Sequence, residues 1–153
     1  MSQSVATSSE QLTQLAVFHV GRYICALSIE RVQEINKNLL LTPVHEAPAF
    51  VRGIINLRGN VVTVIDLRRK LGLEPIELGP TTRNVIVKSD REMVGLLVDA
   101  VDDIIDVPHA TILPTPAHLA KELGESFEGV VPLNNELVAI LELDHLLSDR
   151  TSH

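Results

Sequence analysis

The sequence has few aromatic side chains and a single cysteine. Its 153 residues include three Phe, one Tyr and no Trp, which removes base stacking as a route to nucleic-acid binding. Cys25 cannot form an internal disulfide, and it lies within the apolar run 23–27. We interpret it as a small buried hydrophobe in a protein of a reducing compartment, which predicts a cytoplasmic location.

Long hydrophobic runs and positive charge are also scarce. No apolar stretch reaches the roughly 18 residues that a membrane helix needs, and the first dozen residues are too polar for a signal peptide. The chain carries 13 basic and 20 acidic residues, a formal net charge of −7. Because Lys and Arg gain affinity for phosphates by displacing counterions, this balance disfavours nucleic acid as a partner. We expect neither nucleic-acid binding nor direct membrane insertion.

The familiar motifs of catalysis and ligand binding are missing as well. The six histidines have no second histidine at helical spacing and no Cys or carboxylate at a ligand spacing, so a zinc site is not expected. The sequence contains no G-x-S-x-G, G-x-G-x-x-G or G-x-x-x-x-G-K-S/T motif. Gly53 and Gly59 are followed by Asn60, which does not make a phosphate loop. We predict no catalytic residue, no metal and no cofactor.

Aliphatic residues dominate instead. The 22 Leu, 18 Val and 12 Ile point to an aliphatic core, and the β-branched ones pack well on a pleated sheet. The pairs Gly21-Arg22 and Asn134-Asn135 favour two-residue hairpin turns. This rhythm is typical of an all-β barrel or sandwich. Short apolar runs predict about ten strands, at 15–20, 23–27, 32–35, 39–42, 61–67, 85–88, 93–98, 104–107, 130–133 and 137–141.

Helix signals are few and short. Gly72 and Gly124 each follow a short apolar run, where glycine is a common residue after a helix end. We divide the chain into a flexible N-terminal tail (1–12), one folded domain (13–148) and a flexible C-terminal tail (149–153). Short helices are predicted at 49–54, 67–71, 116–123 and 143–147.

Two local concentrations of charge interrupt the apolar pattern. Acids occupy positions 99, 102, 103 and 106, but their spacing does not fit a calcium loop. We interpret this stretch as a strand, a turn at Asp102-Asp103 and a second strand, with the acids pointing outward. The segment 50–70 carries five basic residues and one acid. It is either a solvated face with one or two ion pairs, or a patch for an acidic partner surface.

Two longer motifs resemble those of a known family. The first combines V-Q-E-I at 32–35 with P-A-F-V-R-G-I-I-N-L-R-G-N-V-V-T-V-I-D-L-R at 48–68. The second is V-G-L-L-V-D-A-V at 94–101. Both are similar to the signatures of the CheW family of chemotaxis coupling proteins, and the likeness extends from about residue 15 to residue 147. Thr63 departs from the family, which often has proline there.

The resemblance implies an all-β fold of two small SH3-like five-stranded β-barrels packed together, with a few short helices. It also implies a non-catalytic scaffold that couples the regulatory domain of a CheA-type histidine kinase to the cytoplasmic tip of methyl-accepting chemoreceptors. Such a protein is cytoplasmic and is recruited to membrane-associated receptor arrays. Two alternatives stay open. One is a CheW-like coupler of a non-flagellar pathway that controls pili or a second messenger. The other is a small nucleic-acid-binding β-barrel.

The family's binding surfaces map onto individual positions of this chain. An apolar groove rimmed by charge suits an amphipathic receptor helix. Val32, Ile35 and Val101 could equally be core residues, because a small double barrel must bury much of its aliphatic content. The kinase-binding positions implied by the resemblance are Val32, Glu34, Ile35, Gly53 and Arg58. The receptor-binding positions that it implies, in a groove between the two barrels, are Gly95, Val101 and Ile104.

Glu34 and Arg58 are charged residues inside apolar motifs, and we predict that they form a structural ion pair. An arginine fork can bind a carboxylate through two parallel hydrogen bonds, which adds geometric order. The pair would hold the loop 56–60 on the first barrel. Removal of either partner would then leave a partly buried charge without its counterion. If the two residues are not coupled, both are direct partner contacts instead.

Overall fold

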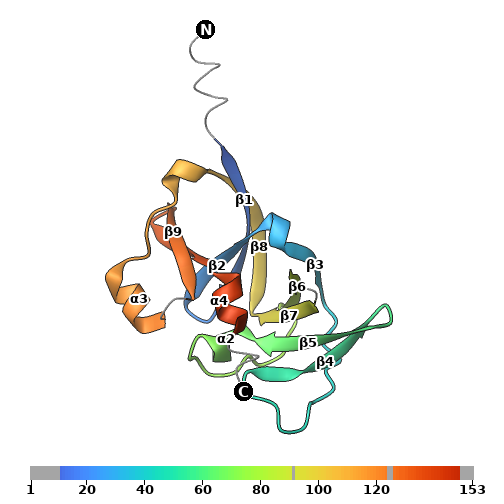
Figure 1. The fold of residues 1–153 in the computed structure, drawn as a ribbon. Coiled ribbons are helices and arrows are strands. Elements are labelled where there is room, and N and C mark those ends of the chain that lie inside the picture. The colour runs from blue at the N-terminus through green and yellow to red at the C-terminus, as the bar shows by residue number, and fades with distance from the viewer. Residues whose placement is uncertain (1–10, 91, 124–125, 149–153) are drawn as a thin grey trace.

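The computed structural model describes residues 11–90, 92–123 and 126–148, and its strands form two five-stranded sheets. We call the first sheet and its helices lobe 1 (residues 11–28, 100–123 and 126–148) and the second lobe 2 (residues 32–90 and 92–98). Lobe 1 lies above lobe 2 in Figure 1. The strand order is β8-β1-β2-β10-β9 in lobe 1 and β3-β6-β7-β5-β4 in lobe 2.

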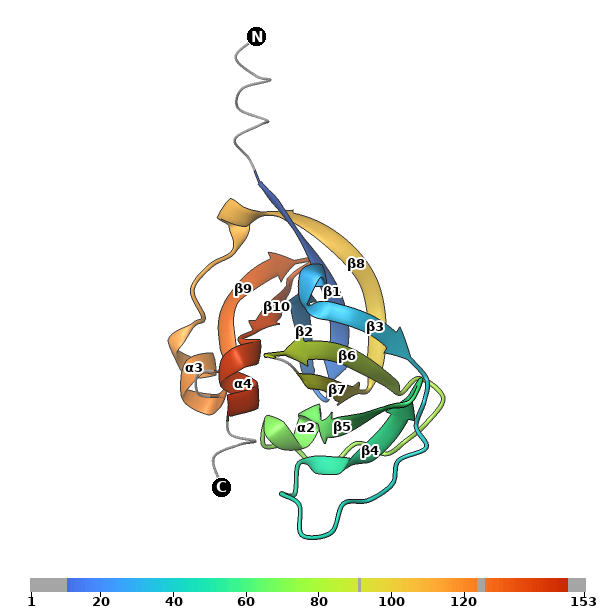
Figure 2. The same cartoon turned by 45° about the vertical axis from the view of Figure 1, so that its right-hand side comes forward.

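The strands of lobe 1 are β1 (Leu12–Val20), β2 (Tyr23–Ser28), β8 (Ala100–Pro108), β9 (Phe127–Leu133) and β10 (Glu136–Leu141). Those of lobe 2 are β3 (Val32–Asn36), β4 (Val51–Leu57), β5 (Asn60–Asp66), β6 (Arg83–Ser89) and β7 (Glu92–Val98). The helical elements are η1 (Ile29–Arg31), α2 (Leu67–Lys70), η2 (His109–Thr111), α3 (Ala117–Leu123) and α4 (Leu143–Ser148). The chain crosses between lobes at η1 and again between β7 and β8, as the turned view shows (Figure 2).

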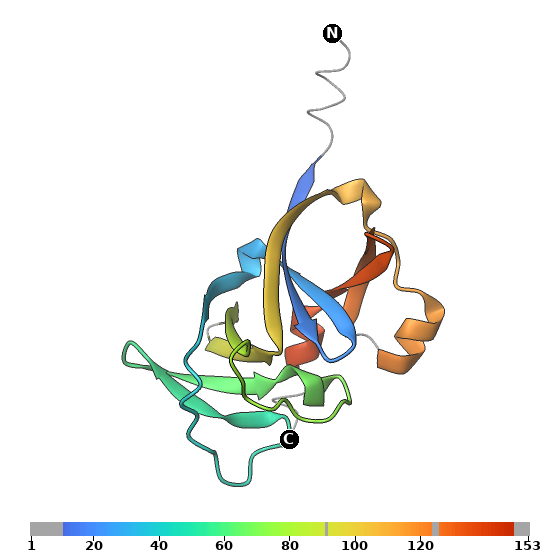
Figure 3. The same ribbon diagram turned by 180° about the vertical axis from the view of Figure 1, so that it is seen from behind.

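Both sheets are strongly curved, and lobe 1 is seen from behind as an open ring of strands (Figure 3). The predicted all-β fold of two five-stranded units is confirmed. Among the residues that the structure describes, however, β8 and β9 share no ladder, nor do β3 and β4. Each predicted barrel is therefore a curled sheet with a seam rather than a closed ring of backbone hydrogen bonds.

Apolar side chains are buried on both faces of the inner strands, so the buried runs of β6 and β7 are continuous rather than alternating. One cluster fills lobe 1 and includes Leu15 and Val17 of β1. A second fills lobe 2 and includes Val62 and Val64 of β5. The largest lies between the lobes and contains residues of both sheets together with three leucines of α4. The lobes are thus joined by a shared core, which we call the inter-lobe core.

The two hairpin turns predicted from the sequence are present. Gly21, with a φ of +60°, joins β1 to β2, and Asn134 and Asn135, with φ of 51° and 67°, join β9 to β10. The predicted helices near 67–71, 116–123 and 143–147 correspond to α2, α3 and α4. Gly124, expected to follow α3, lies outside the described residues. Most of the predicted tails also lie outside them, while Leu12 begins β1.

The segment 49–54 was predicted as a helix, and this prediction is wrong, because it forms the start of β4. Val51 pairs with Ile65 and Gly53 with Val64, so Arg52 is an extra residue, a β-bulge that hides the strand period. The predicted strand at 39–42 is also wrong. It contributes only an isolated bridge between Thr42 and β4.

The predicted turn at Asp102-Asp103 is wrong as well, because β8 runs without interruption through both residues. Ala16 pairs with Ile104 and Phe18 with Val101, so Val17 faces two residues of β8 instead of one. This bulge breaks the alternation of faces, and both aspartates are exposed, as is Asp106. The acids point outward as predicted, but for a different reason.

Candidate functional site

The first family motif places Glu34 and Arg58 in contact. Glu34 lies on the edge strand β3, and Arg58 lies in the turn between β4 and β5. Arg58 Nη2 donates a hydrogen bond to Glu34 Oε1, and Asn36 Nδ2 donates to Glu34 Oε2 at 2.9 Å. β3 and β4 are the two edges of the lobe 2 sheet. The predicted ion pair is therefore present, and it joins across the seam two edges that no backbone ladder joins.

The two partners differ in exposure. The Arg58 side chain is 70% exposed, whereas that of Glu34 is 28% exposed. The hydrogen bond from Arg58, and then that from Asn36, lowers the pKa of Glu34, and the same contact raises the pKa of Arg58. The prediction that both charges are partly buried holds for Glu34 but is wrong for Arg58. Loss of Glu34 would leave a guanidinium that water solvates.

The turn that carries Arg58 has its own support. Arg58 and Gly59 have φ of 52° and 87°, values suited to the two central residues of a tight hairpin turn. Gly59 N donates to Asn56 Oδ1 at 2.9 Å. The loop 56–60 is thus held both by its own hydrogen bond and by the ion pair to β3.

Exposed apolar side chains accompany the ion pair. Ile35 is 37% exposed and Val61 is 68% exposed. Val61 also lines a shallow hollow of about 600 Å³, together with Gln33, Asn60, Lys88, Glu92 and Met93. We refer to Gln33, Glu34, Ile35, Arg58 and Val61 as the lobe 2 rim. It presents apolar, amide and charged groups together at the surface.

Two of the positions assigned to kinase binding do not reach this rim. Val32 packs against the inter-lobe core. Gly53 is buried beside the bulge of β4, and a Cβ there would lie 2.5 Å from the Thr42 carbonyl oxygen. Its φ of +146° is one that side-chain-bearing residues rarely adopt. Gly53 can therefore influence a partner only through the packing beneath the surface, whereas Val32 is half-buried.

The positions assigned to receptor binding fall on two strands. Val101 and Ile104 lie on β8, where Val101 packs on the inter-lobe core and Ile104 is 54% exposed. The exposed acids Asp102 and Asp103 directly precede Ile104 on β8. The side chain of Asp102 contacts β1 of the same lobe, where His19 Nε2 lies 3.3 Å from Asp102 Oδ2. Gly95 is instead buried in β7, against Asn84. Any part that Gly95 takes in a groove is therefore indirect.

The basic segment 50–70 is largely neutralised by ion pairs. Arg52 Nη1 lies 2.7 Å from Asp66 Oδ2, Arg58 pairs with Glu34, and Arg68 Nε lies 2.9 Å from Asp99 Oδ2. Lys70 lies over the ring of Phe50, 4.0 Å from its centroid. Of the two interpretations left open, the structure favours ion pairs over a broad basic patch.

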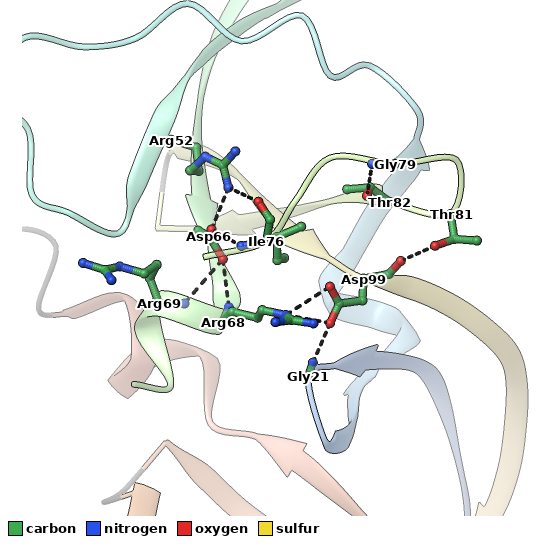
Figure 4. Close-up of polar contacts among 10 residues, drawn as sticks. All are labelled: Gly21, Arg52, Asp66, Arg68, Arg69, Ile76, Gly79, Thr81, Thr82 and Asp99. Atoms are coloured by element: carbon green, nitrogen blue, oxygen red, sulfur yellow. Dashed lines mark hydrogen bonds and ion pairs between the residues drawn. The ribbon is translucent and has the colours of Figure 1, made fainter. Parts of the chain in front are cut away.

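Sequence reasoning missed the network around Asp66, which Figure 4 shows. The Asp66 side chain is fully buried. Its Oδ1 accepts from the backbone N–H of Arg68 at 3.0 Å and of Arg69 at 3.4 Å, and its Oδ2 accepts from Ile76 N at 2.9 Å and from Arg52. Four donors thus satisfy one buried carboxylate. An aspartate directly before a short helix is a common N-cap, and this signal could have been recognised.

Asp99 forms a second network beside the first (Figure 4). Its carboxylate accepts from Arg68 Nε and from the backbone N–H of Gly21, at 2.5 Å in the latter case. Its carbonyl oxygen accepts from Thr81 Oγ1 at 2.8 Å. Asp99 was grouped with the outward-facing acids, and this interpretation is wrong, because its side chain is only 23% exposed.

Within the described ranges, no three or more His, Cys, Asp or Glu side chains converge in a way that could hold a metal ion. No helix in the same part of the chain is long and apolar enough to cross a membrane.

Comparison with known proteins agrees with these observations. The profile of the CheW-like domain family matches residues 14–151. The chain is 36% identical over 155 residues to the probable chemotaxis protein CheW of Rhizobium etli, covering 99% of this chain and 98% of that protein. It is 40% identical over 134 residues to the chemotaxis protein CheW of Rhizobium meliloti, covering 86% and 84%. A crystal structure of the scaffolding protein TtCheW from Thermoanaerobacter tengcongensis matches with a TM-score of 0.83 and 30% identity, over 90% of this chain and 89% of that one.

Proposed function

Because this chain belongs to the CheW family of chemotaxis coupling adaptors, we propose that it binds the regulatory domain of a CheA-type histidine kinase and the cytoplasmic tip of methyl-accepting chemoreceptors at the same time. It performs no catalysis in this role. It is cytoplasmic and is recruited by its partners to receptor arrays at the membrane.

We place the kinase on the lobe 2 rim. The observation that carries this assignment is the pair Glu34–Arg58, a charged contact at the surface with the exposed side chains of Ile35 and Val61 beside it. Partner recognition at such a surface combines an apolar centre with charges that fix the register. Val32 and Gly53 contribute by holding β3 and β4 in place.

We place the receptor on β8 of lobe 1. Ile104 offers an exposed aliphatic anchor, and Val101 lies on the same strand at the border of the inter-lobe core. An amphipathic receptor helix presents apolar side chains at the spacing that such a surface binds. Gly95 supports this arrangement from β7, through the packing of lobe 2.

The test is affinity capture from the native cytoplasm, with the bound proteins identified by mass spectrometry. Wild-type protein should retain a CheA-type kinase and chemoreceptors. Arg58→Ala should lose the kinase, whereas Lys121→Ala, which removes an equal charge from an exposed position on α3, should retain it. Recovery of the kinase in equal amounts by Arg58→Ala would contradict the assignment to the lobe 2 rim.

A second pair of variants tests the receptor surface. Ile104→Ser should retain the kinase but lose the receptors, because it removes the exposed anchor on β8. Leu137→Ser changes an aliphatic side chain of lobe 1 that is 43% exposed on a different strand, and it should retain both partners. Equal loss of receptors in the two variants would place the receptor elsewhere.

A further inference from the structure

The chain passes between the two lobes at Asp99. β7 of lobe 2 ends at Val98 and β8 of lobe 1 begins at Ala100, so one residue connects the two sheets. The backbone N–H of Asp99 donates to the carbonyl of His19 on β1 at 2.9 Å, and its carbonyl accepts from Thr81 of lobe 2. The main chain of this residue is therefore bonded to both lobes.

The side chain of Asp99, like its main chain, is hydrogen-bonded to both lobes. Arg68 of α2, in lobe 2, donates from Nε to both carboxylate oxygens, at 3.1 and 2.9 Å. Gly21, in the β1–β2 turn of lobe 1, donates its backbone N–H to Oδ2. Figure 4 shows the carboxylate lying between these two donors. One carboxylate thus holds an element of each lobe.

Both donors are themselves fixed in position. The backbone N–H of Arg68 is bonded to the buried Asp66. Gly21 has a φ of +60°, and a Cβ at this position would lie 2.7 Å from Leu73 Cδ1 of lobe 2. The turn of lobe 1 therefore packs directly against the Leu73 side chain of lobe 2. Because the backbone of each donor is held in its own lobe, the carboxylate can bind both only while the lobes keep these two elements close together.

The polar contacts at Asp99 differ in kind from the restraint that the inter-lobe core imposes. Burial of its apolar side chains is strongly favourable but has no preferred direction, whereas charge-assisted hydrogen bonds do. The side chains of Arg68 and Asp99 are 31% and 23% exposed, so salt screens their attraction less than that of a surface pair. Close packing in the core restrains the lobes, and the polar contacts add a directional restraint at the point where the chain passes between them.

We propose that Asp99 is a positioning residue that sets the angle between the lobes, and through it the relative orientation of partners docked on separate lobes. The second half of this proposal rests on the proposed function. The first half concerns the isolated protein and can be tested without any partner.

The angle can be measured with two spin labels and pulsed electron paramagnetic resonance. The labels are attached to Lys88→Cys in lobe 2 and Glu136→Cys in lobe 1, both exposed positions. Cys25 is buried, and burial raises the pKa of its thiol to about 12, so the native protein should not be labelled there. In Asp99→Ala we expect the distance distribution to broaden by up to roughly twofold, because a directional restraint at the junction of the lobes is lost while their shared core remains.

The matched control is Asp102→Ala, which removes an exposed carboxylate of the neighbouring strand whose contact to His19 stays within lobe 1. It should leave the distribution unchanged. Arg68→Ala and the milder Asp99→Asn should both broaden the distance distribution. These two variants replace Asp99→Ala in the test if that variant does not fold. Distributions equal to that of the wild type in the folded variants would overturn the proposal.

Binding measurements separate this inference from the proposed function. In Asp99→Asn the affinity for the isolated kinase regulatory domain should stay within about twofold of the wild type, while kinase recruitment to receptor-containing membranes falls roughly fivefold or more. Failure of the wild type to bind the kinase would refute the proposed function, and the distance measurement would still decide the role of Asp99. Unchanged recruitment despite a broadened distribution would overturn the second half of the proposal.

Discussion

Asn84 Oδ1 occupies the space that a Cβ on Gly95 would need. Asn84 lies on β6, is fully buried, and donates from Nδ2 to the carbonyl of Asn38 at 3.4 Å. Its Oδ1 has no hydrogen-bond partner in the described structure. It lies against the Cα of Gly95, where a weak C–H···O contact is the available interaction. The glycine of the second family motif is thus explained by packing inside lobe 2.

We predict that Gly95→Ala destabilises the protein by about 1–3 kcal/mol, because the added methyl group overpacks a filled core. Denaturant unfolding measures the effect. Gly79→Ala is the control, since a Cβ there meets no atom closer than 4.0 Å. The cost should shrink in an Asn84→Ala background, where the obstructing side chain is gone. Equal costs in the two backgrounds would show that Asn84 is not the obstacle.

Asp66→Asn should lower the free energy of unfolding by about 2–4 kcal/mol. The variant removes the counterion of Arg52 and turns an amide donor toward backbone N–H groups that need acceptors. Asp106→Asn, at an exposed position of β8, should change stability by no more than about 0.5 kcal/mol. A loss of unfolding free energy of similar size in both variants would mean that the Asp66 network does not stabilise the protein more than an exposed aspartate does.

The Glu34–Arg58 pair should make stability depend on pH. Because the pKa of Glu34 is lower in the folded state, its contribution is present above the unfolded value of about 4.3 and is lost as pH falls below it. Wild type should therefore be more stable than Glu34→Gln near neutral pH, and the difference should vanish in acid. Chemical denaturation at several pH values measures this, with the exposed Glu77→Gln as control. A stability difference between wild type and Glu34→Gln that stays constant with pH would contradict the lowered pKa of Glu34.

Glu128 should behave in the opposite way. Glu128 is largely exposed, and partial desolvation of its carboxyl, followed by the neighbouring Glu142, raises its pKa. The folded state thus disfavours the ionised form, and stability falls as pH rises from the unfolded pKa to the folded one. We expect Glu128→Gln to have a higher unfolding midpoint than the wild type at neutral pH and an equal one well below pH 4. A variant less stable than the wild type at neutral pH would refute this.

The sequence predicted those features of the fold that depend on neighbouring residues. Gly21-Arg22 and Asn134-Asn135 identified two hairpins, because their backbone preferences are local. The Glu34–Arg58 pair was predicted from two charged residues in apolar motifs. β4 was missed because its bulge at Arg52 removes the alternation by which strands are recognised.

Other features depend on contacts that spacing does not reveal. Asp99 resembled the exposed acids that follow it, yet it binds Arg68, 31 residues away, and Gly21, 78 residues away. The bulge of β8 opposite Val17 made two adjacent aspartates resemble a turn. The space that Gly95 leaves for Asn84 likewise follows only from the pairing of β6 with β7.

The central claim is that this chain connects a kinase to receptors, and co-sedimentation tests it most directly. Receptor-containing membranes and a CheA-type kinase are mixed, the chain is titrated in, and the kinase in the pellet is quantified. The account predicts little kinase in the pellet without the chain, and an amount that rises with added wild type but not with Arg58→Ala. A pellet whose kinase content is the same with and without the chain would contradict it.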